Sequence, residues 1–247
     1  MMTKTFTFTD RDLQILTNFS EISQHIEFRK GRRQATIETN RSLLAEYDFD
    51  TEIKDEFCIY DLPEFLNLID LFKNPKITLN ENKLLLKENK LKIGYSTADT
   101  NIILKPQYTL IDKNRKIFNE KDNDIEFDLT ADDIREIYRL NRKIKLPDIA
   151  IENDEGNIAL KLFAKNQYAS STTLTHILNQ KTNQSFKLNF RFHRFKFLIS
   201  DYKVEIQKFS KSGIVRLSSK EIPLTYEFAL EEDSIFDSNE SEVINNA

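Results

Sequence analysis

The order of elements in this sequence repeats four times, and that repetition limits the folds open to the chain. Helix starts are predicted near Asp10, Asp61, Thr130 and Asn189, where a short polar side chain can cap the first turn. Each predicted helix follows a strand and precedes strands joined by a tight turn. With about eight strands and two helices per half, the pattern predicts an α+β fold with antiparallel sheets outside and the helices together on one face.

The repeat divides the chain into two similar domains, at residues 1–98 and 124–232. Residues 99–123 are interpreted as a connector, because they contain Pro106 and a basic run. Residues 233–247 form an acidic tail that is predicted to be disordered. The stretch Glu231 to Glu242 holds six acidic and no basic residues, so the remaining 34 acidic and 36 basic residues leave the body near +2. A net charge of −4 therefore does not argue against a polyanionic partner.

The amino-acid composition argues against several classes of function. The four glycines are too few and too scattered for a phosphate-binding loop. The single cysteine, Cys58, excludes an internal disulfide, and its apolar surroundings predict a small buried side chain rather than a nucleophile. His25, His176 and His193 lack metal-ligand spacing. We therefore expect no enzyme activity, no cofactor and no metal site. The sequence also has no membrane-length apolar run and no signal-peptide pattern, which favours the cytosol.

The predicted helix over 130–145 carries the strongest charge pattern. At ~100° per residue, Arg135, Arg139 and Arg142 share one face. Ile134, Ile137, Asn141 and Ile144 lie roughly opposite. We expect this helix to pack on one side and to present three guanidinium groups, with no acidic residue on their stripe, on the other. A plain solvated face and a polyanion contact both fit this pattern.

The stretch from Asn189 to Ser200 is ambiguous. Its start alternates like a strand, but Phe192, Phe195 and Ile199 fit helical spacing. The helical interpretation makes Arg191, Arg194 and Lys196 its polar face. The competing interpretation is a solvated face beside a strand.

Several segments resemble the sliding clamps of T-even-type tailed phages, which are DNA polymerase processivity factors. They are Leu16-Thr-Asn-Phe-Ser-Glu-Ile22, Ile59-Tyr-Asp-Leu-Pro-Glu-Phe-Leu66, Arg139-Leu-Asn-Arg142 with Ile149-Ala-Ile151, and the spacing of Phe186 to Tyr202. Two departures are a longer, more basic stretch from Leu104 to Lys121 and a tail that runs past the usual end of the family.

The resemblance implies a DNA-clamp fold and a head-to-tail homotrimer that closes into a ring around duplex DNA. Helices would line the hole and sheets would form the rim. It implies no catalytic site, partnership with a replicative DNA polymerase and a clamp loader, and action in the cytoplasm of an infected bacterial host. The alternatives are a sequence-independent nucleic-acid-binding module that forms no ring, or a structural phage protein.

Charge and resemblance together select candidate residues. The DNA-binding candidates are Arg11, Lys73, Arg135, Arg139, Arg142, Lys143, Arg191, Arg194 and Lys196, a set richer in the second half. The resemblance places a subunit contact between residues 90–96 and 169–178 of a neighbour, with Lys90, Leu91, Lys92, Ile93, Tyr95, Thr172, Leu174, His176 and Ile177. It also implies a partner-peptide pocket at Tyr108, Leu110, Ile111, Phe228 and Leu230. Solvated edges and ordinary core residues are the competing interpretations of the last two groups.

Overall fold

The computed structural model of the chain describes residues 5–165, 172–209 and 212–236. Its helices are α1 (Asp10–Ile22), α2 (Leu62–Asp70), α3 (Tyr108–Glu120), α4 (Ala131–Ile144) and the 3₁₀ turn η1 (Phe192–Arg194). The strands are β1 (Thr5–Phe6), β2 (Ile26–Phe28), β3 (Gly31–Ile37), β4 (Leu43–Ile53), β5 (Phe57–Ile59), β6 (Lys76–Asn80), β7 (Lys83–Glu88), β8 (Leu91–Ser96), β9 (Ile125–Leu129), β10 (Asp148–Asp154), β11 (Asn157–Phe163), β12 (Leu174–Lys181), β13 (Phe186–Arg191), β14 (Tyr202–Phe209), β15 (Ser212–Ser219), β16 (Leu224–Ala229) and β17 (Ile235–Phe236).

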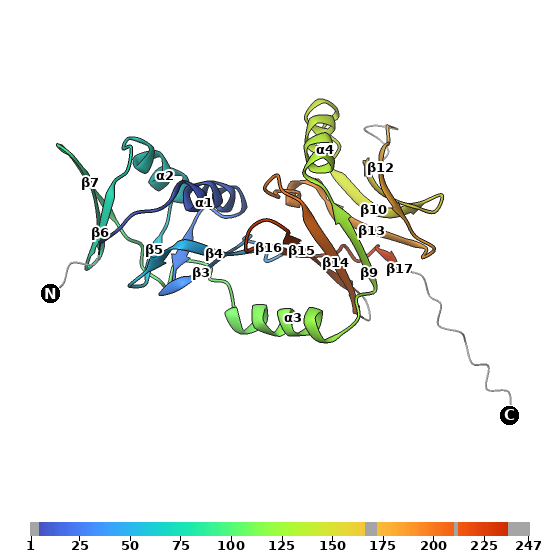
Figure 1. The fold of residues 1–247 in the computed structure, drawn as a ribbon, viewed down its shortest axis with the longest axis horizontal. Helices are drawn as coiled ribbons and strands as arrows, with labels where there is room; N and C mark the ends of the chain where they lie inside the picture. The colour runs from blue at the N-terminus through green and yellow to red at the C-terminus, as the bar shows by residue number, and fades with distance from the viewer. Residues whose placement is uncertain (1–4, 166–171, 210–211, 237–247) are drawn as a thin grey trace.

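The described strands form antiparallel sheets that run across the molecule beneath the helices. A six-stranded sheet, in the order β3-β4-β16-β15-β14-β9, occupies the centre. A four-stranded sheet, β1-β6-β7-β8, and a five-stranded sheet, β12-β11-β10-β13-β17, flank it, and β2 pairs with β5. Helices α1, α2 and α4 lie on one side of this layer, and α3 lies on the other (Figure 1). The predicted α+β arrangement of sheets with helices gathered on one face is confirmed.

Local sequence signals explain three of the predicted helices. Thr9 and Thr130 form capping boxes with Asp12 and Asp133 at the starts of α1 and α4. Asp61 caps α2 through the backbone N–H of Glu64. The buried side of each helix then packs on the sheets, and the apolar residues of both halves join one core. These helices begin where the capping residues predicted that they would.

Two predictions of local structure were wrong, and one helix was not predicted. Asn189 does not start a helix, since it lies within β13, and only the short turn η1 follows it. The segment interpreted as a connector contains the thirteen-residue helix α3, which the sequence pattern did not predict. Ile235 and Phe236, which fall in the predicted disordered tail, pair with β13 as β17. Residues 169–171 of the predicted contact strand and residues 237–247 of the tail lie outside the described residues.

The two halves are joined through one strand pair in the central sheet. Strand β4 of the first half pairs with β16 of the second, with Ala45 opposite Tyr226 and Leu44 opposite Glu227. Helix α3 covers the outer face of this seam, where Arg115 binds Glu46 at 2.6 Å and Asn114 donates to Glu227 at 2.9 Å. The connector therefore holds both halves from outside through ionic and amide contacts.

A buried polar network joins the halves on the helix side of the same seam. The Tyr226 hydroxyl donates to Asn18 Oδ1 at 2.5 Å and accepts from the backbone N–H of Leu198 at 3.1 Å. Asn18 Nδ2 donates to the carbonyl of Lys196 at 2.8 Å. Helix α1 is thereby tied to the irregular segment 195–198, which replaces the expected fourth helix.

Replacing Tyr226 with Phe should lower the free energy of unfolding by about 1–3 kcal/mol, because the buried Asn18 Oδ1 and the Leu198 N–H both lose their partner. Urea unfolding measures the loss. The matched control is Tyr60→Phe, since Tyr60 is 56% exposed and should change stability little. Equal losses in the two variants would show that the network adds nothing beyond packing.

Candidate nucleic-acid interface

Helix α4 is fixed at both ends, so the direction of its exposed side chains is well defined. At its start, the Asp133 carboxylate accepts the backbone N–H of Thr130 at 3.0 Å and lies 2.7 Å from His176 Nε2 on β12. At its end, Asn141 Oδ1 accepts the backbone N–H of Leu146 at 2.7 Å, and Lys145 adopts a left-handed backbone with φ of 58°. Its buried face holds the helix on the second half of the molecule.

The arginine stripe lies on the exposed face of α4, as predicted. Arg135, Arg139 and Arg142 are exposed, together with Lys143. The prediction that no acidic residue lies on their stripe did not include the acids beside it, one turn earlier, which make ion pairs with two of the arginines. Arg135 lies 2.5 Å from Asp132, and Arg139 lies 2.5 Å from Glu136, whose pKa its guanidinium lowers. Such exposed pairs are weak, so a phosphate can exchange with the carboxylate.

The exposed charges of the other two helices on this side are mostly acidic. Helix α1 presents Asp10, Arg11 and Glu21. Helix α2 presents Glu64 and Asp70, and Lys73 follows its end. Positive charge is therefore concentrated on α4, where Lys145 adds to the stripe. The predicted candidates Arg11 and Lys73 are exposed, but each lies among carboxylates.

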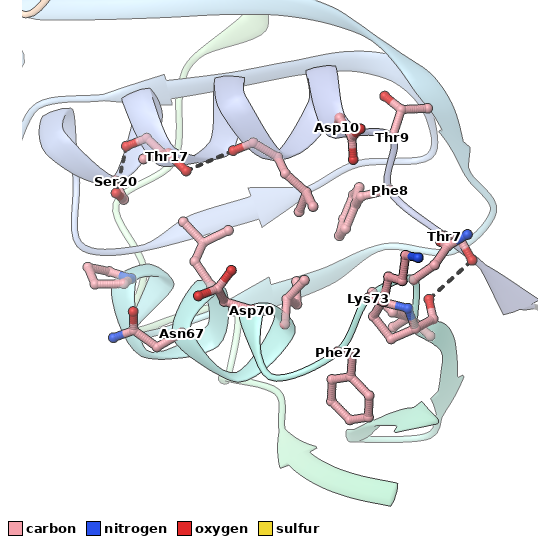
Figure 2. A pocket seen from close by; sticks show the side chains of 17 residues that line it. Thr7, Phe8, Thr9, Asp10, Thr17, Ser20, Asn67, Asp70, Phe72 and Lys73 are labelled. Atoms are coloured by element: carbon pink, nitrogen blue, oxygen red, sulfur yellow. Dashed lines mark hydrogen bonds between the residues drawn. The ribbon is translucent and has the colours of Figure 1, made fainter. Parts of the chain in front are cut away.

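A hollow of about 1120 Å³ separates α1 from α2 and contains Lys73 at one end (Figure 2). Its lining combines apolar side chains such as Phe8 with the carboxylates of Asp10 and Asp70. The hydroxyls of Thr17 and Ser20 donate to carbonyls of α1 itself, at 2.9 Å and 2.7 Å. These polar groups do not converge on one point of the hollow (Figure 2).

The cations of the 191–196 segment serve internal contacts. Arg191 binds the buried carboxylate of Asp148 at 2.6 Å. Arg194 binds Glu231 at 2.8 Å. Lys196 Nζ donates to the backbone carbonyl of residue 21 in α1 at 2.6 Å. Without the predicted helix, these three side chains do not form a free polar face, and we no longer expect them to contribute as α4 does.

Strands β8 and β12 lie at the ends of their sheets, so each has one edge without a partner among the described residues. Leu91 of β8 is 44% exposed and Ile177 of β12 is 51% exposed. Further along these strands, Tyr95 packs against Phe65 of α2, and His176 turns toward α4. The candidate contact residues Lys90, Leu91, Lys92, Ile93, Tyr95, Thr172, Leu174, His176 and Ile177 thus lie on or beside two bare edges.

The five residues predicted to form a partner-peptide pocket are not brought together. Phe228 packs against Phe190 and Phe197 on the helix side of the central sheet. Its neighbour Glu227 faces α3 on the other side, because successive side chains of a strand alternate. Tyr108 lies on that outer side, with the Arg29 guanidinium 4.2 Å from its ring centre. Ile111 is buried and Leu110 is exposed on the same helix, whereas Leu230 is buried beyond β16. The pocket prediction was wrong.

Burial explains two perturbed side chains that could otherwise suggest chemistry. Cys58 is 1% exposed, and burial raises the pKa of its thiol to about 11. Burial likewise raises the pKa of Tyr108 to about 12. Both groups stay protonated at neutral pH, and the prediction that Cys58 is a buried small side chain is confirmed. No described helix is both long and apolar enough to cross a bilayer.

Sequence reasoning missed residues whose partners lie far away in the chain. Asn18 and Tyr226 are separated by 208 positions, so no local spacing could indicate their contact. Asn189 was interpreted as a helix cap because its residue type fits one, but it holds the chain's C-terminal segment instead. The sequence shows that these side chains are polar, but only the tertiary fold shows which groups they bind.

Comparisons with known proteins agree with this geometry. Residues 126–232 match the family described as gp45 sliding clamp, C terminal. The sliding clamp of Vibrio phage KVP40 is 25% identical over 83% of this chain and 92% of its own length. That of Escherichia phage RB69 is 23% identical over 91% and 96%. The proliferating cellular nuclear antigen of Entamoeba histolytica superposes with a TM-score of 0.64 at 12% identity, covering 94% of this chain and all of that one.

The fold is therefore that of the DNA clamps, with antiparallel sheets and with α1, α2 and α4 on one side of them (Figure 1). Within that class, the matches to phage proteins over most of the chain confirm its resemblance to the sliding clamps of T-even-type phages.

Replacing Asp133 with Asn should destabilise the fold by about 0.5–1 kcal/mol at pH 7, since it weakens the contacts at the start of α4. Burial alone would raise the pKa of Asp133, but hydrogen bonds from Thr130 and His176 lower it. A lowered pKa contributes stability above the unfolded value of about 3.9, and that contribution disappears as the pH falls through the folded value. Denaturant unfolding between pH 7 and pH 3 should show the gap between variant and wild type closing with acid.

Asp132→Asn is the matched control, because Asp132 lies in the same helical turn but its side chain is 90% exposed. It should lose less stability. An Asp133→Asn deficit that stays constant down to pH 3 would contradict the role given to this carboxylate.

Proposed function

We propose that this chain is a non-catalytic sliding clamp that encircles duplex DNA as a homotrimeric ring and tethers a replicative DNA polymerase. The observation that carries the proposal is the concentration of exposed cations on α4, in a clamp fold whose strands β8 and β12 each have one edge that pairs with no other described strand. The names of the phage relatives support the same activity. We place its action in the cytoplasm of the infected host.

Attraction to DNA would come from α4 of each subunit. Guanidinium and ammonium groups bind phosphates without reading bases, and this attraction falls steeply with salt. Arg142 and Lys143 make no ion pair with a described residue, so they would meet phosphate first. Arg135 and Arg139 would exchange a carboxylate for a phosphate. Because α1 and α2 present more acids than bases, contact with the duplex would be uneven around each subunit.

Closure would come from the edges of β8 and β12. A head-to-tail contact between identical subunits joins two different surfaces. Such contacts form a closed ring when a whole number of equal rotations from subunit to subunit completes one full turn. Pairing β8 with β12 of a neighbour would satisfy the free backbone groups of both edges. It would also bury Leu91 and Ile177, which are exposed in the single chain. The ring then supplies residence time on DNA that the weak phosphate contacts do not.

The domain division follows from this assignment. We propose residues 1–98 and 124–232 as the two clamp domains and 99–123 as the connector that contains α3. A polymerase and a clamp loader are the protein partners we propose. Their docking place is not the predicted five-residue pocket, since its residues lie on both faces of one sheet.

Changing Arg139 and Arg142 together to Glu should weaken binding to a duplex by about tenfold to a hundredfold and make its salt dependence shallower. Fluorescence anisotropy at several salt concentrations measures both effects. The matched control is Lys113→Glu with Lys116→Glu, which reverses two exposed charges on α3, on the opposite side of the sheets. That control should bind DNA nearly as well as wild type.

Both variants and the wild type should have a mass in solution of about three times 29.1 kDa. A wild-type chain that stays monomeric at high concentration would contradict the ring. Equal DNA affinity of the Arg139/Arg142 variant and wild type would contradict the assignment of α4, even if the trimer forms.

A further inference from the structure

The C-terminal segment, residues 231–236, lies along an edge of the five-stranded sheet. Its strand β17 pairs with β13, with Phe236 opposite Phe186 and Ile235 opposite Lys187. Strand β13 would otherwise be the bare end of that sheet among the described residues. An extended segment added to a sheet edge is a recurring way in which proteins bind peptides. Here the chain supplies the added strand itself.

Asn189 of β13 holds the backbone of this segment. Its N–H donates to Ser234 Oγ at 2.9 Å, and its Nδ2 donates to the carbonyl of Asp233 at 3.1 Å. Its own carbonyl accepts the N–H of Glu231 at 2.9 Å. Asn189 is 4% exposed, and its Oδ1 has no hydrogen-bond partner within the described part of the chain. Asn189 therefore holds an extended chain through two backbone groups, of Glu231 and Asp233, and through the hydroxyl of Ser234.

Gly213 forms a notch for the aromatic ring of Phe236. A Cβ placed on Gly213 would lie 2.9 Å from Phe236 Cζ and 2.8 Å from Leu230 Cδ1, which is closer than real Cβ contacts. The same Cβ would lie 3.2 Å from the backbone carbonyl of Gln207, which cannot move away easily. The ring thus occupies space that only glycine leaves free. Lys208 Nζ, 5.8 Å from the ring centre, adds a cation beside it.

Cations accompany the acidic residues of the segment. Lys165 lies 2.9 Å from Asp233, and Arg194 lies 2.8 Å from Glu231. Both cations also line a hollow of about 440 Å³ beside the segment. The recognised pattern is a carboxylate three residues before an aromatic ring, with the chain extended between them.

Only a few residues attach this segment to the sheet. Strand β17 contains two residues, and Ile235 is 61% exposed. So few contacts allow the segment to open without unfolding the sheet beneath it. A partner that offers the same pattern can then compete for the same edge.

We propose that the β13 edge, with Asn189 and the Gly213 notch, is a docking site for a protein partner. The partner contributes an extended acidic segment with an aromatic residue three positions after a carboxylate. The chain's own residues Asp233 to Phe236 occupy the site until that partner displaces them. This inference does not depend on DNA encirclement, and the test below contains no DNA.

The test uses the full chain and a fluorescein-labelled peptide with the sequence of residues 230–240. The variant Phe236→Ala removes the internal competitor's anchor, so it should bind the peptide at least about tenfold more tightly than wild type. In the same background, Gly213→Ala should abolish binding, because the added Cβ fills the notch. A peptide with Ala in place of the residue corresponding to Phe236 should not bind either.

Exchanging the charges of an ion pair distinguishes the loss of a specific contact from a general loss of folding. Lys165→Glu in the Phe236→Ala chain should weaken binding about tenfold, and a peptide with Lys in place of the residue corresponding to Asp233 should restore it. Lys116→Glu on α3 is the matched control and should have no effect. Thermal unfolding checks that each variant is folded.

The proposal is overturned if Phe236→Ala and wild type bind the peptide equally, or if the peptide lacking its aromatic residue binds as well as the parent. It is also overturned if Phe236→Ala captures no peptide but lowers the mass of the assembly. In that case the segment is a contact between copies of this chain.

Discussion

The position of the first half of this molecule relative to the second depends on the pairing of β4 with β16 in the central sheet. This pair is where the first half of the chain meets the second within one sheet, so its register sets the position of α1 relative to α4. Polar groups secure it on both faces. Tyr226 reaches Asn18 on the helix side, while Glu227 and Glu46 bind α3 on the outer side. Alternation along the two strands makes both sets of contacts possible at one place.

The same seam accounts for the uneven charge of the helix side. Where a fourth helix was expected, the chain runs as the irregular segment 195–198, whose backbone groups need partners. Tyr138, Asn18 and Tyr226 provide them from three different elements. Because the nearby cations bind internal carboxylates and a carbonyl, α4 is the element of this side, among the described residues, that presents a stripe of exposed positive charge. A ring built from this chain would therefore hold DNA through one helix per subunit.

Much of the fold could be predicted from local chemistry, and the failures share a physical cause. Capping residues such as Thr9, Asp61 and Thr130 act within a few positions, so the helices that follow them were predicted correctly. Helix α3 has no side-chain cap at its start and is held by distant partners such as Glu46. Asn189 has the right type for a cap, but its role depends on residues more than forty positions later.

The candidate site shows the same division between local and distant information. The arginine stripe of α4 follows from helical periodicity, and it was found. Its ion pairs with Asp132 and Glu136 also lie within one turn, and they were overlooked because the acids sit beside the stripe. Arg191 looked equivalent to the α4 arginines, but its partner Asp148 is 43 positions away. The burial of the acidic partner separates the two cases, because the Asp148 side chain is 1% exposed whereas that of Glu136 is 34% exposed.

We propose that a closed ring, and not affinity alone, keeps this protein on DNA. Retention on circular duplex DNA measures it most directly. Protein is loaded onto a closed circle with a clamp loader, free protein is removed, and the fraction still bound is followed before and after one cut that makes the circle linear. A sliding ring should stay on the closed circle and leave within the time needed to slide off the new ends. Equal loss from closed and cut DNA would contradict encirclement.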